Sequence, residues 1–92
     1  MFYKIDKILA VTAGEKPVTV PVHGQAFLLQ NLSHNATVFY KDKDIDGKNV
    51  KAADGFAVGP EMESRFPMIA SELSIVADKP GTDVRVMILE VG

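Results

Sequence analysis

The stretch that decides the fold reads Glu72-Leu-Ser-Ile-Val-Ala-Asp-Lys-Pro-Gly-Thr-Asp-Val-Arg-Val-Met-Ile-Leu-Glu90. Two runs of β-forming residues flank a Pro-Gly turn, which is the pattern of a hairpin or of a short crossover between two sheets. Strand side chains alternate between two faces, so one face of the second run is predicted to be core. That face carries Val84, Val86 and Ile88. The other face begins polar and ends apolar, so its last half is also expected to be covered; it carries Arg85, Met87, Leu89 and Val91.

The rest of the chain repeats this pattern of short apolar runs separated by turn residues. Further strands are predicted at residues 8–12, 17–22, 26–32, 36–41, 50–58 and 62–69. The apolar spacing before residue 9 fits a short helix about as well as a strand, and the β-branched residues at 8–12 favour the strand. Pro17 and Pro21 cannot donate to a ladder and predict an edge strand, whereas 26–32 and 36–41 predict a tight hairpin. No segment keeps a helical period. The pattern predicts an all-β fold, a small antiparallel β-sandwich or barrel of about seven to nine short strands.

Size and charge narrow the class of protein. We expect the 92 residues to form one domain, 1–92, with residues 1–13 as a candidate N-terminal arm. The net charge is −2, no basic run exists and no apolar run reaches membrane length, so nucleic acid and membrane are not expected as partners. The mixed charges of Met1-Phe-Tyr-Lys-Ile-Asp-Lys7 interrupt any signal-peptide apolar region, which predicts synthesis in the cytoplasm.

One motif has the form of a metal site. Asp42-x-Asp44-x-Asp46-Gly47 matches the opening of a calcium-binding loop, in which alternate carboxylates supply the oxygen ligands. The twelfth position of that loop requires a Glu and is Ala53, and three lysines partly neutralise the segment. The preferred interpretation is a solvated acidic loop, and Asp42, Asp44 and Asp46 remain a weak metal candidate.

No catalytic residues are predicted. His23 and His34 are the only histidines, and each lies in a turn without further metal ligands nearby. Ser33 is adjacent to His34, and adjacency does not orient a triad. Asn31 and Asn35 are expected to hydrogen-bond the backbone of their own turn. The sequence therefore predicts a protein that is not an enzyme and that has no cofactor.

The most informative feature is an excess of apolar residues for a chain of this length. A 92-residue domain without cysteine buries a little over roughly 60% of its unfolded surface, so assembly is the leading source of added stability. Apolar residues near the termini, the edge strands and the second face of the last strand are candidates for an interface. They are Phe2, Tyr3, Phe66, Met68, Met87 and Leu89. The alternative is that the two sheets bury them all.

The order of these motifs resembles small accessory structural proteins of tailed bacteriophages, of the kind that decorate or cement the capsid. The segments that carry the likeness are Phe27–Ser33, Ala36–Lys41, Asp46–Val50, Asp54–Pro60, Ala70–Ala77 and Thr82–Val86. The resemblance implies a non-enzymatic virion structural protein made in the host cytoplasm, with the major capsid protein and its own copies as partners. It implies a homotrimer ahead of a homodimer. The alternative function is a small carbohydrate- or host-surface-binding module of a tail or fibre, with Tyr3, Phe39 and Tyr40 as its aromatic platform.

Overall fold

The computed structural model describes residues 2–43 and 55–91, which form two four-stranded antiparallel sheets without a helix. The all-β prediction is confirmed. Sheet A contains, in spatial order, β1 (Tyr3–Ala13), β8 (Thr82–Val91), β3 (Ala26–Asn31) and β6 (Met68–Ile69). Sheet B contains, in spatial order, β2 (Val18–Pro21), β7 (Glu72–Ala77), β4 (Val38–Asp42) and β5 (Phe56–Val58). No helix of the described residues is long and apolar enough to cross a membrane.

Consecutive strands lie in different sheets everywhere except between β4 and β5. The turn at residues 78–81 therefore joins β7 of sheet B to β8 of sheet A. Of the two predicted alternatives, a hairpin or a crossover between sheets, the structure has the crossover. The predicted hairpin of residues 26–32 with 36–41 is wrong, because β3 pairs with β8 and β6 while β4 pairs with β7 and β5. Phe27 of β3 and Tyr40 of β4 meet across the core, with ring centroids 6.0 Å apart. Burying both rings places the two strands face to face instead of side by side.

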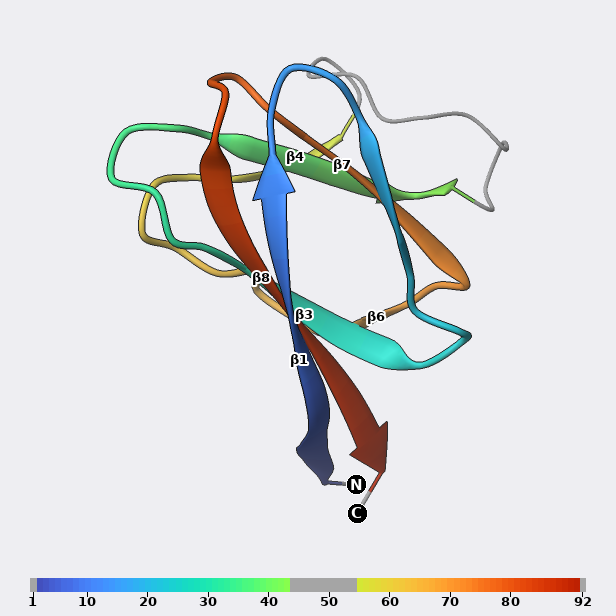
Figure 1. Ribbon diagram of the computed structural model, residues 1–92. Helices are drawn as coiled ribbons and strands as arrows, with labels where there is room; N and C mark the ends of the chain where they lie inside the picture. Colours follow the sequence, from blue (N-terminus) through green and yellow to red (C-terminus); the bar gives the residue numbers. More distant parts are fainter. Residues whose placement is uncertain (1, 44–54, 92) are drawn as a thin grey trace.

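The longest pair in the molecule is β1 with β8, and Figure 1 shows the two strands side by side as far as the adjacent ends of the chain. Their register runs from Tyr3 opposite Val91 to Ala13 opposite Thr82, with an irregularity between Ile5 and Lys7. Residues 3–13, which the sequence offered as an arm, thus form a paired strand. The pairing brings the first and last strands together at one edge of sheet A.

The core lies between the sheets and follows the predicted alternation. Val84, Val86 and Ile88 of β8 are at most 1% exposed and belong to one buried cluster with Leu73 and Ile75 of β7. The predicted edge strand is confirmed, because β2 is the outermost strand of sheet B and ends at Pro21. The side chains on the other side of sheet A do not belong to this core, and they form the outer face of the sheet.

Candidate interaction surfaces

The outer face of sheet A divides into an apolar part and a polar part. The β1–β8–β3 register sets its side chains in rows across the strands: Tyr3 with Val91, Ile5 with Leu89 and Ala26, and Ile8 with Met87 and Leu28. Ile69 of β6 extends the second row, because it pairs with Ala26. We call these side chains the apolar end: Tyr3, Ile5, Ile8, Ala26, Leu28, Ile69, Met87, Leu89 and Val91.

The next rows of the same face are polar. Ala10, Arg85 and Gln30 form one row, and Thr12 lies opposite Asp83 in the row beyond it. Nη1 of Arg85 lies 3.4 Å from Oε1 of Gln30, and Nε2 of Gln30 donates to Oε2 of Glu63 at 3.1 Å. The apolar end therefore has a defined border formed by hydrogen-bonded side chains.

Two predicted interface residues, Met87 and Leu89, are covered within the chain itself. Met87 is 9% exposed and Leu89 is 5% exposed, although neither belongs to the core cluster between the sheets. Both lie on the central β8, so the side chains of β1 and β3 cover them from the sides. They form the floor of the apolar end, and little of their surface is left for a partner to bury.

Their neighbours at the rim of the apolar end remain open to solvent. Exposed fractions range from 44% to 66% for Tyr3, Ile8, Ile5, Val91 and Ile69. These side chains together expose roughly 500 Å² of apolar surface, near the upper limit for the largest patch of a soluble monomer. Only Tyr3 was a predicted member. The alternation of Tyr3 and Ile5 with Lys4 was the available signal for Ile5.

β1 reverses its apolar side at the apolar end. Leu9 and Val11 face inward and pack against the core, as expected for a sandwich strand. Before them the pattern changes: Ile8 and Ile5 face outward, while Lys7 pairs with inward-facing Ile88. The outer face of an antiparallel sandwich is usually the polar one. The apolar side chains on the outer face of β1 are therefore unusual for a surface that contacts only water.

The other predicted interface residues lie elsewhere. Phe2 is 82% exposed, Met68 is partly buried against the core, and Phe66 is exposed in the segment before β6. Phe66 lines a hollow of about 380 Å³ together with Tyr40, Phe56 and Met62, which we call the seam surface. The rings of Tyr40 and Phe56 lie 5.6 Å apart. Glu63, Ser64 and Arg65 line the same hollow, so the seam surface combines exposed aromatic side chains with polar ones, and it is built from β4, β5 and the segment that follows β5.

Tyr40 is the buried member of the seam surface. It is 4% exposed, and burial raises its pKa above the ordinary value of 10.0, while a side-chain hydrogen bond with Ser64 acts in the opposite direction. The aromatic platform of Tyr3, Phe39 and Tyr40 is not assembled, because Tyr3 lies in sheet A and Tyr40 is enclosed. The exposed rings at the hollow are those of Phe56 and Phe66.

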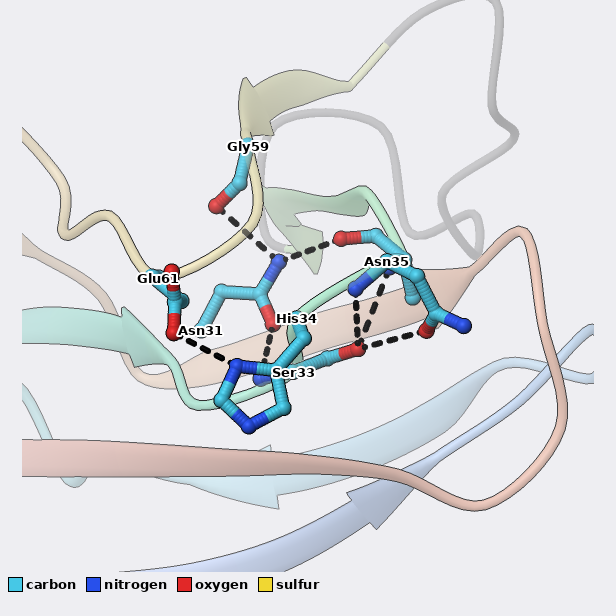
Figure 2. A network of polar contacts seen from close by, with 7 residues as sticks. Asn31, Ser33, His34, Asn35, Gly59 and Glu61 are labelled. Atoms are coloured by element: carbon cyan, nitrogen blue, oxygen red, sulfur yellow. Dashed lines mark hydrogen bonds and ion pairs between the residues drawn. The ribbon is translucent and has the colours of Figure 1, made fainter.

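A polar cluster beside the seam surface has a structural explanation (Figure 2). Asn31 is 1% exposed, and its Nδ2 donates to the carbonyl oxygens of Ala36 at 2.8 Å and of Val58 and Gly59 at 3.1 Å. Its Oδ1 accepts from the N–H of Ser33 at 2.9 Å, so the predicted turn-bonding role is confirmed and extends to the strand β5. The cluster fastens the β3–β4 connection to the end of β5.

The remaining candidates for chemistry do not come together. His34 contacts Glu61 at the surface, while the Ser33 hydroxyl accepts from the N–H groups of Asn35 and Ala36. Asp42 ends β4, and Asp44 and Asp46 lie outside the described residues. Within residues 2–43 and 55–91, no three acidic or histidine side chains are grouped as metal ligands. The two apolar surfaces are thus the features of the described chain that call for a functional explanation.

Comparison of the chain with protein-family models, with curated proteins and with solved structures finds no significant match.

Proposed function

We propose that this chain is a non-enzymatic structural protein that acts by assembly, and that it decorates or cements the capsid shell of a tailed bacteriophage. The observation that carries the assembly role is the exposure of large apolar side chains at two separate places, the apolar end and the seam surface. The resemblance of the sequence to phage accessory proteins supports the capsid as the setting. One surface then serves contacts between copies, and the other serves the shell.

The physical advantage of this arrangement is avidity. A capsid presents many copies of one surface, so an oligomer gains overall affinity from single contacts that are weak. Apolar surfaces of this size bind without a deep pocket, because burying them removes apolar area from water. In this proposal the seam surface contacts the major capsid protein, and Phe56 and Phe66 are the side chains that enter that contact.

The test is co-sedimentation of the purified chain with capsids that lack accessory proteins. We expect the wild-type chain to pellet with the capsids and Phe66→Asp to remain in the supernatant. Thr19→Asp is the matched control, since it adds the same charge at an exposed strand position of sheet B. A folded wild-type chain that never pellets with capsids contradicts the capsid role.

The second candidate function is a carbohydrate- or host-surface-binding module. It is favoured by one observation, the exposed rings of Phe56 and Phe66 beside a hollow of about 380 Å³, within the size range of small-ligand pockets. Tyr40 lines the same hollow and the chain has no Trp, so tyrosine fluorescence reports on its occupancy. Saturable quenching by a glycan, lost in Phe66→Ala, supports this second function over the first.

A further inference from the structure

We propose that the apolar end binds a second copy of this chain, apolar end against apolar end, about a two-fold axis. The inference rests on the proposed function, because it names the surface through which an assembly protein meets its own copies. It assigns the outer face of sheet A to self-association and leaves the seam surface for a different partner. The resemblance to phage proteins implies a trimer, whereas the shape and chemistry of this face point to a pair.

The size of the apolar end fits a dimer contact. The rows from Met87 to Val91 span about 13 Å along β8, and the four strands span about 15 Å across the sheet. The exposed members of the face supply roughly 500 Å² of accessible surface, because Met87, Leu89 and Ala26 are already at most 9% exposed. A specific interface should bury about 1,000 Å² in total, or about 500 Å² from each partner, so the face is just large enough for contact between two copies.

The apolar end carries no charge among its own side chains, and charged residues lie next to it. None of its nine side chains is charged. Lys4 and Glu90 form an ion pair, with Nζ and Oε1 3.4 Å apart, and Oδ2 of Asp6 accepts from Nε2 of Gln25 at 3.3 Å. Contact between two copies therefore brings apolar side chains together, and the nearby charges already have partners within the chain.

The apolar end has both a recess and protruding side chains, so two copies of it can fit against each other. A hollow of about 300 Å³ is lined by Tyr3, Ala26, Ile69, Leu89 and Val91 of the apolar end, and also by Gln25 and Glu90. Ile5 lies opposite Leu89 in the same row, and Ile5 and Ile69 remain 53% and 66% exposed. A two-fold interface requires that one patch supply both the protruding side chain and the recess that receives it. The apolar end contains both.

The experiment is sedimentation equilibrium of the full chain and of three variants at about 100 μM, because interfaces at the small end of the size range bind weakly. Ile69→Asp changes the most exposed side chain of the apolar end. Phe66→Asp tests the seam surface, and Thr19→Asp is the charge-matched control on sheet B. Circular dichroism confirms the β fold of each variant, and Ile69→Lys replaces Ile69→Asp if the latter does not fold.

The expected result is a dimeric wild type, a monomeric Ile69→Asp chain with the wild-type β spectrum, and dimeric Phe66→Asp and Thr19→Asp chains. The dissociation constant of the dimer is expected to rise at least 100-fold for Ile69→Asp. A wild-type oligomer that Ile69→Asp and Ile69→Lys leave intact overturns this inference while the proposed function stands. A wild-type trimer overturns the two-fold arrangement. A wild-type monomer overturns the inference as well, and capsid co-sedimentation then decides separately on the proposed function.

Discussion

Replacing Asn31 by alanine tests how the β3–β4 connection is held to β5. The Asn31 side chain donates two amide protons to three carbonyl oxygens, those of Ala36, Val58 and Gly59, and accepts one proton from the N–H of Ser33. Each such hydrogen bond contributes about 1 kcal/mol net, and buried carbonyls left without a donor add to the loss. Asn31→Ala is therefore expected to lower the free energy of unfolding by about 3 kcal/mol.

Urea denaturation followed by far-UV circular dichroism measures this loss. A slope of about 1.5 kcal/mol per molar urea for a chain of this size converts it into a fall in midpoint of about 2 M. Asn35→Ala is the matched control, because Asn35 is exposed and its Oδ1 contacts only the Ser33 hydroxyl among the described contacts. A loss below about 1 kcal/mol for Asn31→Ala, or an equal loss for Asn35→Ala, would mean that the Asn31 hydrogen bonds do not hold the β3–β4 connection to β5.

Three further predictions concern the core, a turn and the floor of the apolar end. Burial raises the pKa of Tyr40, so the neutral phenol favours the folded state. The free energy of unfolding is expected to hold below pH 10.0 and to fall as the pH rises above it. Tyr40→Phe should flatten that fall in urea titrations at pH 9 to 11. Gly81 has a φ of +66°, so Gly81→Ala should cost about 1 kcal/mol in the same assay, and a cost no larger than that of Gly14→Ala would contradict this. Leu89→Asp should lower stability by about 3 kcal/mol because it buries a carboxylate, and a folded monomer with wild-type stability would show that Leu89 is not enclosed.

The sequence predicted those features of the fold that depend on local chemistry. The alternation of Val84, Val86 and Ile88 identified the core face of β8, and Pro17 and Pro21 identified β2 as an edge. A proline lacks the N–H that an interior strand must donate, and the side chains of a buried face recur at every second residue. Both signals can therefore be recognised in the sequence of a single strand.

Which strands pair was not predictable in the same way. The hairpin expected between residues 26–32 and 36–41 is absent because the chain crosses to the other sheet after β3. That crossing is stabilised by contacts between distant residues, such as the hydrogen bonds from Asn31 to Val58 and Gly59. Short apolar runs separated by turns are equally compatible with pairing side by side and with packing face to face, so their pattern alone leaves the topology open.

The same limit explains the interface residues. Met87 and Leu89 were expected on a partially covered face, and the structure places them on β8 between β1 and β3, strands that are remote in sequence. Val91 was expected on that same face but was not among the predicted interface residues, and Ile69 was not predicted at all, because an isolated aliphatic residue near a turn or a strand end is common on any surface. Their meaning comes from the register, which sets them beside Ile5 and Tyr3 on one face.

We propose that other protein chains cover the two apolar surfaces on an assembled particle. The decisive experiment is electron microscopy of capsids decorated with the purified chain. We expect density for the chain over the joints between capsid subunits, with the seam surface on the shell and the outer face of sheet A against a second copy. Single copies whose Ile5, Ile69 and Phe66 all face solvent would overturn this proposal.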